Sequence, residues 1–127
     1  MTMHVDTQQL ECLTEAVYFE ARGETTKGQE LVAQVIKNRV NDNNFPNSYC
    51  AVINQKGQFT YKRNLPIKEP ERYNAIKEVA LNVMTDKYRY GKVDNIIGYH
   101  NLTVTPRWTL KFNTRLKVGN HVFYGTS

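Results

Sequence analysis

The spacing of apolar residues near the N-terminus predicts a helix over residues 11–21. A helix advances about 100° per residue, so residues three or four apart share one face. One stripe then carries Leu13, Ala16, Val17 and Glu20, with Leu10 and Ala21 at its margin, and the opposite, solvated side carries Glu11, Glu15 and Tyr18. Gly23 is placed to end the helix in the left-handed conformation. Glu20 therefore interrupts an otherwise apolar face just before the helix ends.

The same spacing predicts two further long helices and one short helix. The second is expected over residues 28–40, after Thr26 and Gln29, which have the spacing of a capping box. Its apolar face consists of Leu31, Val32, Val35, Ile36 and Val40, and its last turn carries Lys37 and Arg39, where cations suit the helix dipole. A short helix is expected over residues 49–55. The last helix is expected over residues 70–87, beginning at a proline.

The C-terminal third of the chain changes to a pattern typical of strands. Residues 93–99 and 118–124 predict two short strands that pair with each other. Residues 56–68 and 101–117 are expected to be loops, and long loops in a compact domain are usually functional. Helices followed by a small sheet indicate a single α+β domain over residues 1–127, with a cleft between two lobes.

Glu20 is the candidate for acid–base chemistry. A carboxylate on an apolar surface loses hydration when it ionises, so we expect the pKa of Glu20 to be raised. A glutamic acid that keeps its proton near neutral pH can act as a general acid. The alternative is a carboxylate without a catalytic role, which is either neutralised by Arg22 or Arg39 or reaches water at the end of the helix.

The charge balance indicates an anionic partner, because 17 basic residues exceed 12 acidic ones and give a net charge of +5. Nucleic acid, an acidic membrane surface and anionic bacterial envelope polymers all fit this charge. The basic residues are spread along the chain, so solubility or general affinity for a cell wall is favoured and no nucleic-acid partner is expected. No stretch approaches the roughly 18 apolar residues that cross a bilayer. The N-terminus also has no signal-peptide pattern, so we expect synthesis in the cytoplasm and no stable membrane insertion.

The cysteines and histidines are weaker candidates for chemistry. Two free, buried thiols are the default for Cys12 and Cys50 in a reducing cytosol, and a disulfide between them is the alternative. His4, His100 and His121 lack the spacing of metal ligands, so no metal is expected. A catalytic pair with Cys50 as the nucleophile and a histidine as the base is supported by residue type only. No phosphate-binding glycine loop or GxSxG motif occurs, and no organic cofactor is expected.

Several motifs make the chain resemble the cell-wall hydrolase family of the spore-cortex-lytic enzyme (SleB) type. They are Ala16-Val17-Tyr18-Phe19-Glu20-Ala21-Arg22-Gly23-Glu24, Gly28-Gln29, Asn38-Arg39-Val40, Phe45-Pro46, Cys50-Ala51-Val52-Ile53, Gly57-Gln58-Phe59, Tyr99-His100, Pro106, Trp108 and Gly119-Asn120-His121-Val122-Phe123-Tyr124. These motifs stand in order from about residue 12 to residue 124 and are sparsest over residues 96–117. Thr60 stands where many relatives have serine.

The resemblance implies a lysozyme-like fold, in which a mainly helical lobe and a small antiparallel β element flank a groove for glycan strands. It also implies cleavage of the β-1,4 bond between N-acetylmuramic acid and N-acetylglucosamine in peptidoglycan, by a lytic transglycosylase or a hydrolytic muramidase. The general acid of the family corresponds to Glu20. Glu24, which lies past the glycine in a freer environment, is the second choice for the acid, or a residue that shapes the site.

The resemblance further suggests residues that contact the sugars. The aromatic residues that would offer flat apolar faces to sugar rings are Phe59, Tyr61, Tyr99 and Trp108. The residues that would form hydrogen bonds with N-acetyl groups are Gln58, His100 and Asn101. Packing in the core is the alternative for the aromatic residues. No second acid is tied to Glu20 by a motif, since Asp42 and Asp94 match by residue type only. A lone acid favours transglycosylation, because glycosidases that use water normally need a second carboxylate.

A wall-cutting domain without an export signal or an anchor fits a phage endolysin that acts on the wall in the periplasm after release. We expect it to act as a monomer. Two other functions are left open. The first is an N-acetylmuramoyl-L-alanine amidase, an enzyme class that commonly uses zinc. The second is a module that binds glycan without cutting it.

Overall fold

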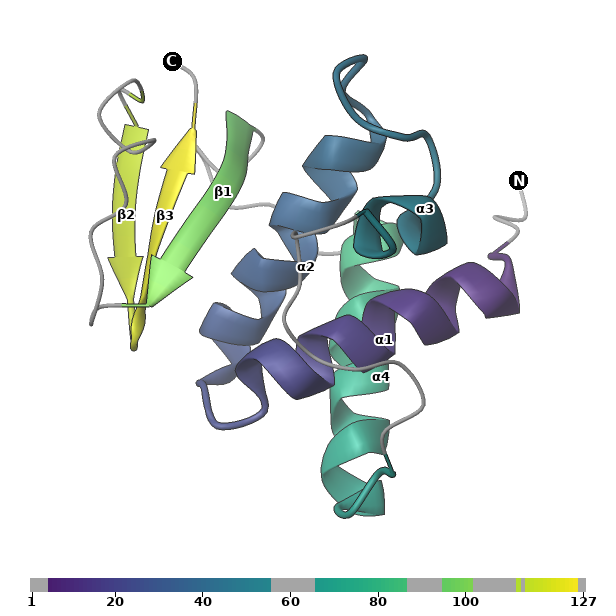
Figure 1. Cartoon of the computed structure of the whole chain (residues 1–127). Coiled ribbons are helices and arrows are strands. Elements are labelled where there is room, and N and C mark those ends of the chain that lie inside the picture. Colours follow the sequence, from purple (N-terminus) through teal and green to yellow (C-terminus); the bar gives the residue numbers. More distant parts are fainter. Residues whose placement is uncertain (1–4, 56–65, 87–94, 102–111, 113, 126–127) are drawn as a thin grey trace.

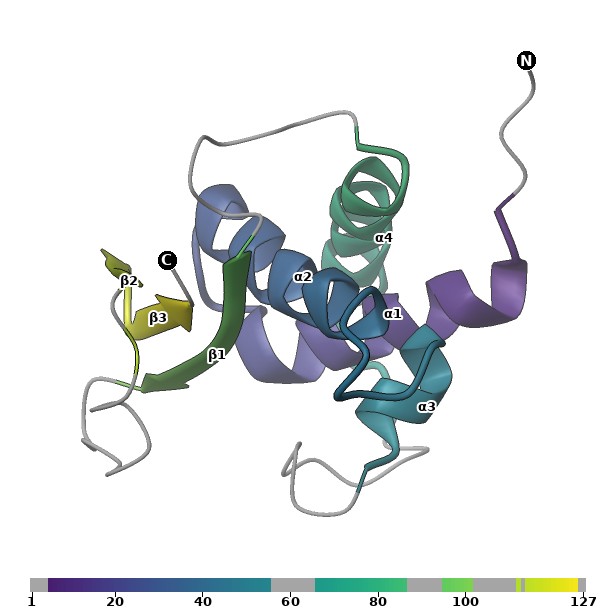
Figure 2. The same cartoon turned by 90° about the horizontal axis from the view of Figure 1, so that it is seen from above.

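A group of helices and a small sheet make up the described structure in a computed structural model of the chain (Figure 1). The structure describes residues 5–55, 66–86, 95–101, 112 and 114–125. Its elements are, in order, α1 Thr7–Ala21, α2 Thr26–Val40, α3 Tyr49–Ile53, α4 Pro70–Met84, β1 Ile96–Asn101, β2 Thr114–Val118 and β3 His121–Gly125. The sheet lies beside α2, and α3 lies on the other side of that helix (Figures 1 and 2). This arrangement confirms the predicted α+β class. No helix in the described ranges is long and apolar enough to span a membrane.

Capping side chains determine where the helices begin. Helix α1 begins before the predicted residue 11, because the Asp6 carboxylate accepts hydrogen bonds from the backbone N–H groups of the first turn. Helix α2 begins at Thr26, because Thr25 Oγ1 accepts a hydrogen bond from the backbone N–H of Gly28 at 3.2 Å. The predicted capping box with Thr26 at the cap is therefore wrong by one residue. Helix α4 has a proline in its first turn, as predicted.

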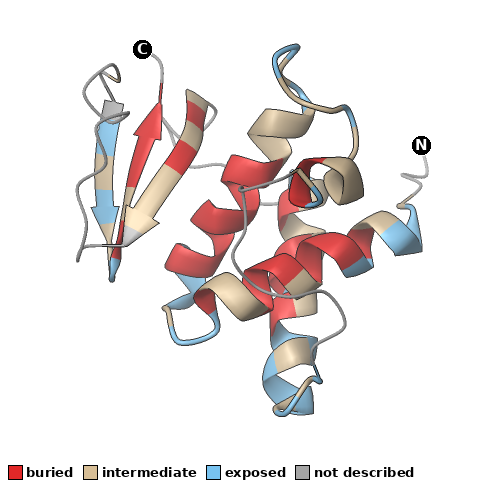
Figure 3. Cartoon of the chain, viewed as in Figure 1, coloured by how far each residue is buried: buried red, intermediate tan, exposed pale blue. Residues whose placement is uncertain are grey.

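The core lies where α1, α2 and α4 pack together (Figure 3). Its buried members on these helices include Leu13, Ala16, Val17, Leu31, Val32, Val35, Ile36, Ile76, Val79, Ala80 and Val83. The apolar stripes predicted for α1 and α2 are thus confirmed, although Val40 is only half-buried. The buried face of α4 is narrower than the predicted stripe, since Ala75 is exposed.

Tyr18 is fully buried, and its predicted place on a solvated face is wrong. The reason is that α4 covers this side of α1. The rings of Tyr18 and Tyr73 lie 5.5 Å apart in an edge-to-face contact, and the Tyr73 hydroxyl donates to Glu11 Oε2 at 2.7 Å. Hydrogen bonds from Lys77 and from Tyr73 lower the pKa of Glu11. Helix α1 therefore has neighbours on two sides, which the spacing of its own residues cannot reveal.

The sheet has the strand order β1-β3-β2, and both neighbouring pairs are antiparallel. Pairing of β1 with β3 confirms the predicted pair of strands. The predicted loop over residues 101–117 is wrong for residues 114–117, which belong to β2. The predicted strand over residues 118–124 is in part wrong, because residue 118 ends β2 and a turn at residues 119–120 precedes β3. A two-residue turn joins β2 to β3, and its first residue, Gly119, has a φ of +58°. Glycine takes this conformation without steric cost, and a glycine first in such a turn is typical of hairpins.

Side chains from the end of α2 attach the sheet to the helices. Asn38 Nδ2 donates to the backbone oxygen of Ile96 at 2.7 Å, and Arg39 Nε donates to the backbone oxygen of Ile97 at 2.8 Å. The register of β1 against β3 is irregular between Ile96 and Gly98. An irregularity of this kind leaves backbone groups without a partner in the strand ladder. The side chains of α2 bond these groups, so Asn38 and Arg39 hold one end of β1 against the helical part.

The neighbouring Lys37 lies in the last turn of α2, as predicted, and also joins α2 to α4. Its Nζ donates to the backbone oxygens of Val83 at 2.8 Å and Met84 at 3.3 Å, and it forms an ion pair with Asp86 at 2.6 Å. The last carbonyl groups of a helix have no partner within the helix, so an outside donor satisfies them. Lys37 therefore caps α4 from a different helix.

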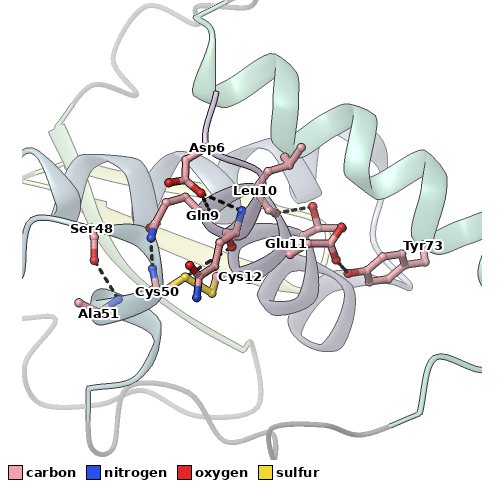
Figure 4. Close-up of a disulfide and its surroundings, with 11 residues drawn as sticks. Asp6, Gln9, Leu10, Glu11, Cys12, Ser48, Cys50, Ala51 and Tyr73 are labelled. Carbon is pink, nitrogen blue, oxygen red and sulfur yellow. Dashed lines mark hydrogen bonds between the residues drawn. A yellow bond between two sulfur atoms is a disulfide. The ribbon is translucent and has the colours of Figure 1, made fainter. Parts of the chain in front are cut away.

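A disulfide joins Cys12 in α1 to Cys50 in α3 (Figure 4). The two Cα atoms are 5.3 Å apart, within the usual range for a disulfide. The default prediction of two free thiols is wrong, and the alternative of a bridge is correct. The geometry also removes Cys50 as a nucleophile, since its sulfur is bonded to Cys12. Two segments separated by 38 residues of sequence are thereby held together.

Candidate active site

Glu20 lies in the last turn of α1 and is half-buried. It follows Leu13, Ala16 and Val17, which are all fully buried, at helical spacing. This position agrees with the predicted stripe, in which a carboxylate extends an apolar face. The raised pKa of Glu20 and its role as the acid stay predictions.

Side chains from α2 and α4 hold the backbone that follows Glu20. Gln29, which is 8% exposed, donates from Nε2 to the backbone oxygens of Ala21 and Glu24 at 3.3 Å. Arg72 Nη1 donates to the backbone oxygen of Arg22 at 2.8 Å. These donors bind backbone oxygens at the end of α1 and in the loop that follows it. The predicted left-handed Gly23 is wrong, because Gly119 is the only glycine with positive φ in the described part of the chain.

Glu24 is nearly buried, with a side chain 9% exposed, so the freer environment predicted for it is wrong. Its Oε1 accepts a hydrogen bond from the backbone N–H of Asn120 at 2.7 Å, and its Oε2 accepts one from Asn120 Nδ2 at 3.1 Å. The two residues are 96 positions apart in the sequence. The carboxylate therefore joins the loop between α1 and α2 to the turn between β2 and β3.

His121, the first residue of β3, lies beside this carboxylate and is 7% exposed. Its Nδ1 is 3.4 Å from Glu24 Oε1, and its ring contacts the Tyr99 ring edge-to-face at a centroid distance of 5.0 Å. Burial lowers the pKa of His121, and the charge of His100 adds to this shift while that of Glu24 opposes it. The net effect favours a neutral imidazole in the folded protein.

We expect the buried His121 to make the protein less stable in mild acid. Its folded pKa lies below the unfolded value of 6.5, so its contribution to stability is present above pH 6.5 and is lost as the pH falls through the folded pKa. Urea unfolding at pH 7.5 and pH 5.5 measures this loss. The variant His121→Gln should lose less unfolding free energy between these pH values than the unsubstituted protein. An equal loss in both proteins would contradict the prediction.

Two adjacent residues predicted to contact sugar point to opposite faces of the sheet. Tyr99 is half-buried and contacts His121 and Phe123, whose ring centroid is 5.5 Å away. The next residue, His100, has its Nε2 hydrogen-bonded to the Tyr124 hydroxyl at 2.6 Å, and the two rings stack. Neighbouring residues in a strand alternate between faces. The rings of Tyr99 and His100 therefore lie on different sides of the sheet, and their contacts with sugar stay predictions.

Other predicted sugar contacts fall outside the described residues. These are Gln58, Phe59, Tyr61 and Trp108, together with the side chain of Asn101, whose backbone belongs to β1. Their roles stay predictions. Within the described residues, no group of three or more His, Cys, Asp or Glu side chains could hold a metal ion.

Sequence reasoning missed the roles of Gln29, Asn120 and His121. All three belong to motifs that carry the family resemblance, but their residue types alone indicated no function. One local signal was available, since Gly119-Asn120 between two alternating segments is typical of a hairpin turn. No local signal links that turn to Glu24, because the contact joins distant parts of the chain.

The fold and the site together define an α+β domain with a carboxylate in the last turn of its first helix. The loop that follows this helix contacts a small antiparallel sheet. The model of the Cell Wall Hydrolase family matches residues 23–124, which is more than half of the chain. The chain therefore belongs to the Cell Wall Hydrolase family. Glu20 lies just before the matched range.

Curated relatives agree with this family. The chain is 32% identical over 116 residues to a spore cortex-lytic enzyme of Bacillus cereus and 33% identical over 113 residues to one of Bacillus subtilis strain 168. These matches cover 90% and 87% of this chain but 43% and 35% of the relatives. The chain thus spans less than half the length of the relatives it matches.

Solved structures extend the comparison to the whole fold. The catalytic domain of the Bacillus cereus SleB protein matches with a TM-score of 0.77 and 27% identity, covering 98% of this chain and 94% of that domain. The catalytic domain of the germination-specific lytic transglycosylase SleB from Bacillus anthracis matches with a TM-score of 0.75 and 27% identity, covering 98% and 99%. The predicted lysozyme-like α+β fold is confirmed by these matches.

Proposed function

We propose that the chain is a peptidoglycan glycosidase of the lytic transglycosylase type, with Glu20 as its general acid and base. The observation that carries the proposal is the likeness of the fold, over 98% of the chain, to the catalytic domain of the germination-specific lytic transglycosylase SleB from Bacillus anthracis. Glu20 supports it as a half-buried carboxylate at the end of an apolar stripe. Membership of the Cell Wall Hydrolase family agrees with the proposed substrate.

In the proposed reaction, Glu20 donates its proton to the oxygen that bridges N-acetylmuramic acid and N-acetylglucosamine. The bond from this oxygen to the anomeric carbon of the muramic sugar breaks, and positive charge develops on the ring of that sugar. The 6-hydroxyl of the same sugar then attacks the anomeric carbon. Glu20 takes up the proton of this hydroxyl, which restores the acid and leaves a 1,6-anhydro end. No water is consumed.

The use of a single acid is supported by the hydrogen bonds that two other candidate carboxylates already accept. Glu24 accepts hydrogen bonds at both oxygens from Asn120. Asp42 Oδ1 accepts one from the backbone N–H of Asn44 at 2.8 Å, within the turn after α2. Asp94 lies outside the described residues. Because Glu24 and Asp42 already accept hydrogen bonds from the protein, attack by the hydroxyl of the sugar itself is the favoured route.

Digestion of purified peptidoglycan followed by mass spectrometry tests the proposal. We expect new glycan ends that carry 1,6-anhydro-N-acetylmuramic acid. The mass of each such product is lower than that of the hydrolytic product by one water molecule, about 18 mass units. Reducing muramic ends would instead identify a hydrolytic muramidase. Release of peptides from intact glycan would identify the amidase. Binding of peptidoglycan without any cleavage product would identify the non-catalytic module.

The disulfide supports action outside a reducing cytosol, because such bonds persist in oxidising surroundings. The net charge of +5 suits the anionic polymers of a bacterial envelope. Three points about the chain stay predictions, because neither the family nor the relatives test them. They are that the chain is a phage endolysin, that it is synthesised in the cytoplasm and that it acts as a monomer.

A further inference from the structure

We propose that Glu24 is a positioning residue, which holds the sheet and its Tyr99 against the end of α1 that carries Glu20. This inference rests on the proposed function for its effect on activity. It removes Glu24 as the second choice for the acid and gives it a different task.

The first argument is the direction of the hydrogen bonds at Glu24. Both of its oxygens accept from N–H groups of Asn120, at 2.7 and 3.1 Å. With a side chain only 9% exposed, the carboxylate depends on these donors to replace water. A group that accepts at both oxygens in this way does not present a proton to a substrate.

The second argument is the fit between the carboxylate and the turn. A Cβ atom added to Gly119 would lie 2.8 Å from Glu24 Oε1, which is closer than such atoms approach. The oxygen thus occupies space that only a glycine leaves open at this position. The positive φ of Gly119 gives a second reason for glycine there. The turn is shaped to receive this carboxylate.

The third argument is that both sides of the contact are held in place. On the helical side, Gln29 Nε2 bonds the backbone oxygen of Glu24, and Thr25 caps α2 directly after it. On the sheet side, the turn leads into His121, whose ring contacts Tyr99. A displacement of the turn therefore moves Tyr99 relative to α1.

The fourth argument is that the sheet has a second attachment elsewhere. Asn38 and Arg39 bond backbone oxygens of Ile96 and Ile97, at the start of β1. The contact with Glu24 lies near the other end of that strand, because Asn101 at the end of β1 pairs with His121. One attachment alone would let the sheet tilt about it. Two attachments at opposite ends fix its orientation.

An exchange of amide and carboxylate tests the proposal. In Glu24→Gln, the new NH₂ group faces the NH₂ group of Asn120, and one hydrogen bond is lost. In the double variant Glu24→Gln/Asn120→Asp, the glutamine oxygen still accepts from the backbone N–H of residue 120, and its NH₂ group donates to the new carboxylate. The net charge stays the same as in the unsubstituted protein. Glu78→Gln, at an exposed position on α4, is the matched control.

We expect Glu24→Gln to lower kcat/KM for peptidoglycan about tenfold, mainly through a higher KM, and the double variant to recover to within about threefold. The acidic and basic limbs of the pH–rate profile should stay in place. The kcat/KM of Glu78→Gln should be the same as that of the unsubstituted protein. A double variant as slow as Glu24→Gln, or a pH limb that disappears with Glu24, would overturn the proposal, because the carboxylate itself would then be needed.

Amide hydrogen exchange at Asn120, measured by NMR, separates this proposal from the proposed function. We expect exchange to be faster in Glu24→Ala than in the unsubstituted protein, and close to the unsubstituted rate in the double variant. Unchanged exchange in Glu24→Ala would overturn the attachment, whatever the activity. If the unsubstituted chain cuts no glycan, the proposed function fails and the exchange rates alone decide whether the attachment exists.

Discussion

Replacement of Glu20 by glutamine should slow peptidoglycan cleavage by about 10²- to 10⁴-fold, the usual contribution of a positioned general acid. Glutamine has nearly the same shape but cannot donate a proton to the bridging oxygen. Binding of peptidoglycan should be unchanged, because the sugar-binding surface is untouched. Turbidity loss of a wall suspension measures cleavage, and co-sedimentation with insoluble wall measures binding.

Glu11→Gln is the matched control for this experiment, since it makes the same change at an exposed residue of the same helix. The glutamine at position 11 can still accept a hydrogen bond from Tyr73, so we expect full activity. If Glu20→Gln cleaves the wall at a rate within threefold of the unsubstituted protein, Glu20 is not the acid. The alternative of a carboxylate without a catalytic role would then be correct.

Loss of the disulfide should lower the free energy of unfolding by about 4 kcal/mol. This value follows from the chain entropy that a closed loop removes from the unfolded state, for a sequence separation of 38 residues. The bond also joins α1, which carries Glu20, to α3, so its loss removes a link next to the core. Urea unfolding of Cys12→Ala/Cys50→Ala and of the unsubstituted protein, each with and without reductant, measures the difference.

The double cysteine variant should be insensitive to reductant, whereas the unsubstituted protein should lose stability when reductant is added. An unfolding midpoint of the unsubstituted protein that does not change with reductant would show that Cys12 and Cys50 are not bridged in solution. That result would restore the default of two free thiols and would remove the support for an oxidising site of action.

Local periodicity was enough to predict α1, α2, α4 and the pairing of the first and last strands. Each of these elements has one strongly apolar side, so the spacing of its own residues reports both its type and its buried face. The helix starts were less accurate, since they depend on which of several nearby polar residues forms the cap, as Thr25 does in place of Thr26. Strand β2 carried a readable signal in its alternation and its Gly119-Asn120 turn.

The position of Glu20 was also predictable from local sequence. A glutamate that follows Val17 by three residues lies on the same stripe wherever the helix packs. The family resemblance pointed to the same residue on independent grounds. Spacing could not predict that Tyr18 is buried, since the contact of α4 with the other side of α1 depends on residues more than fifty positions away.

By itself, the sequence determined the three long helices, the first and last strands, the apolar faces that these elements bury, and that a carboxylate interrupts one of those faces. These properties depend on neighbours within a few residues. The tertiary structure alone decided that Cys12 and Cys50 are bridged, that α4 covers Tyr18, and that Glu24 binds Asn120. Each of these contacts joins residues that are tens of positions apart, and its free energy depends on a geometry that forms only when the helices and the sheet have packed.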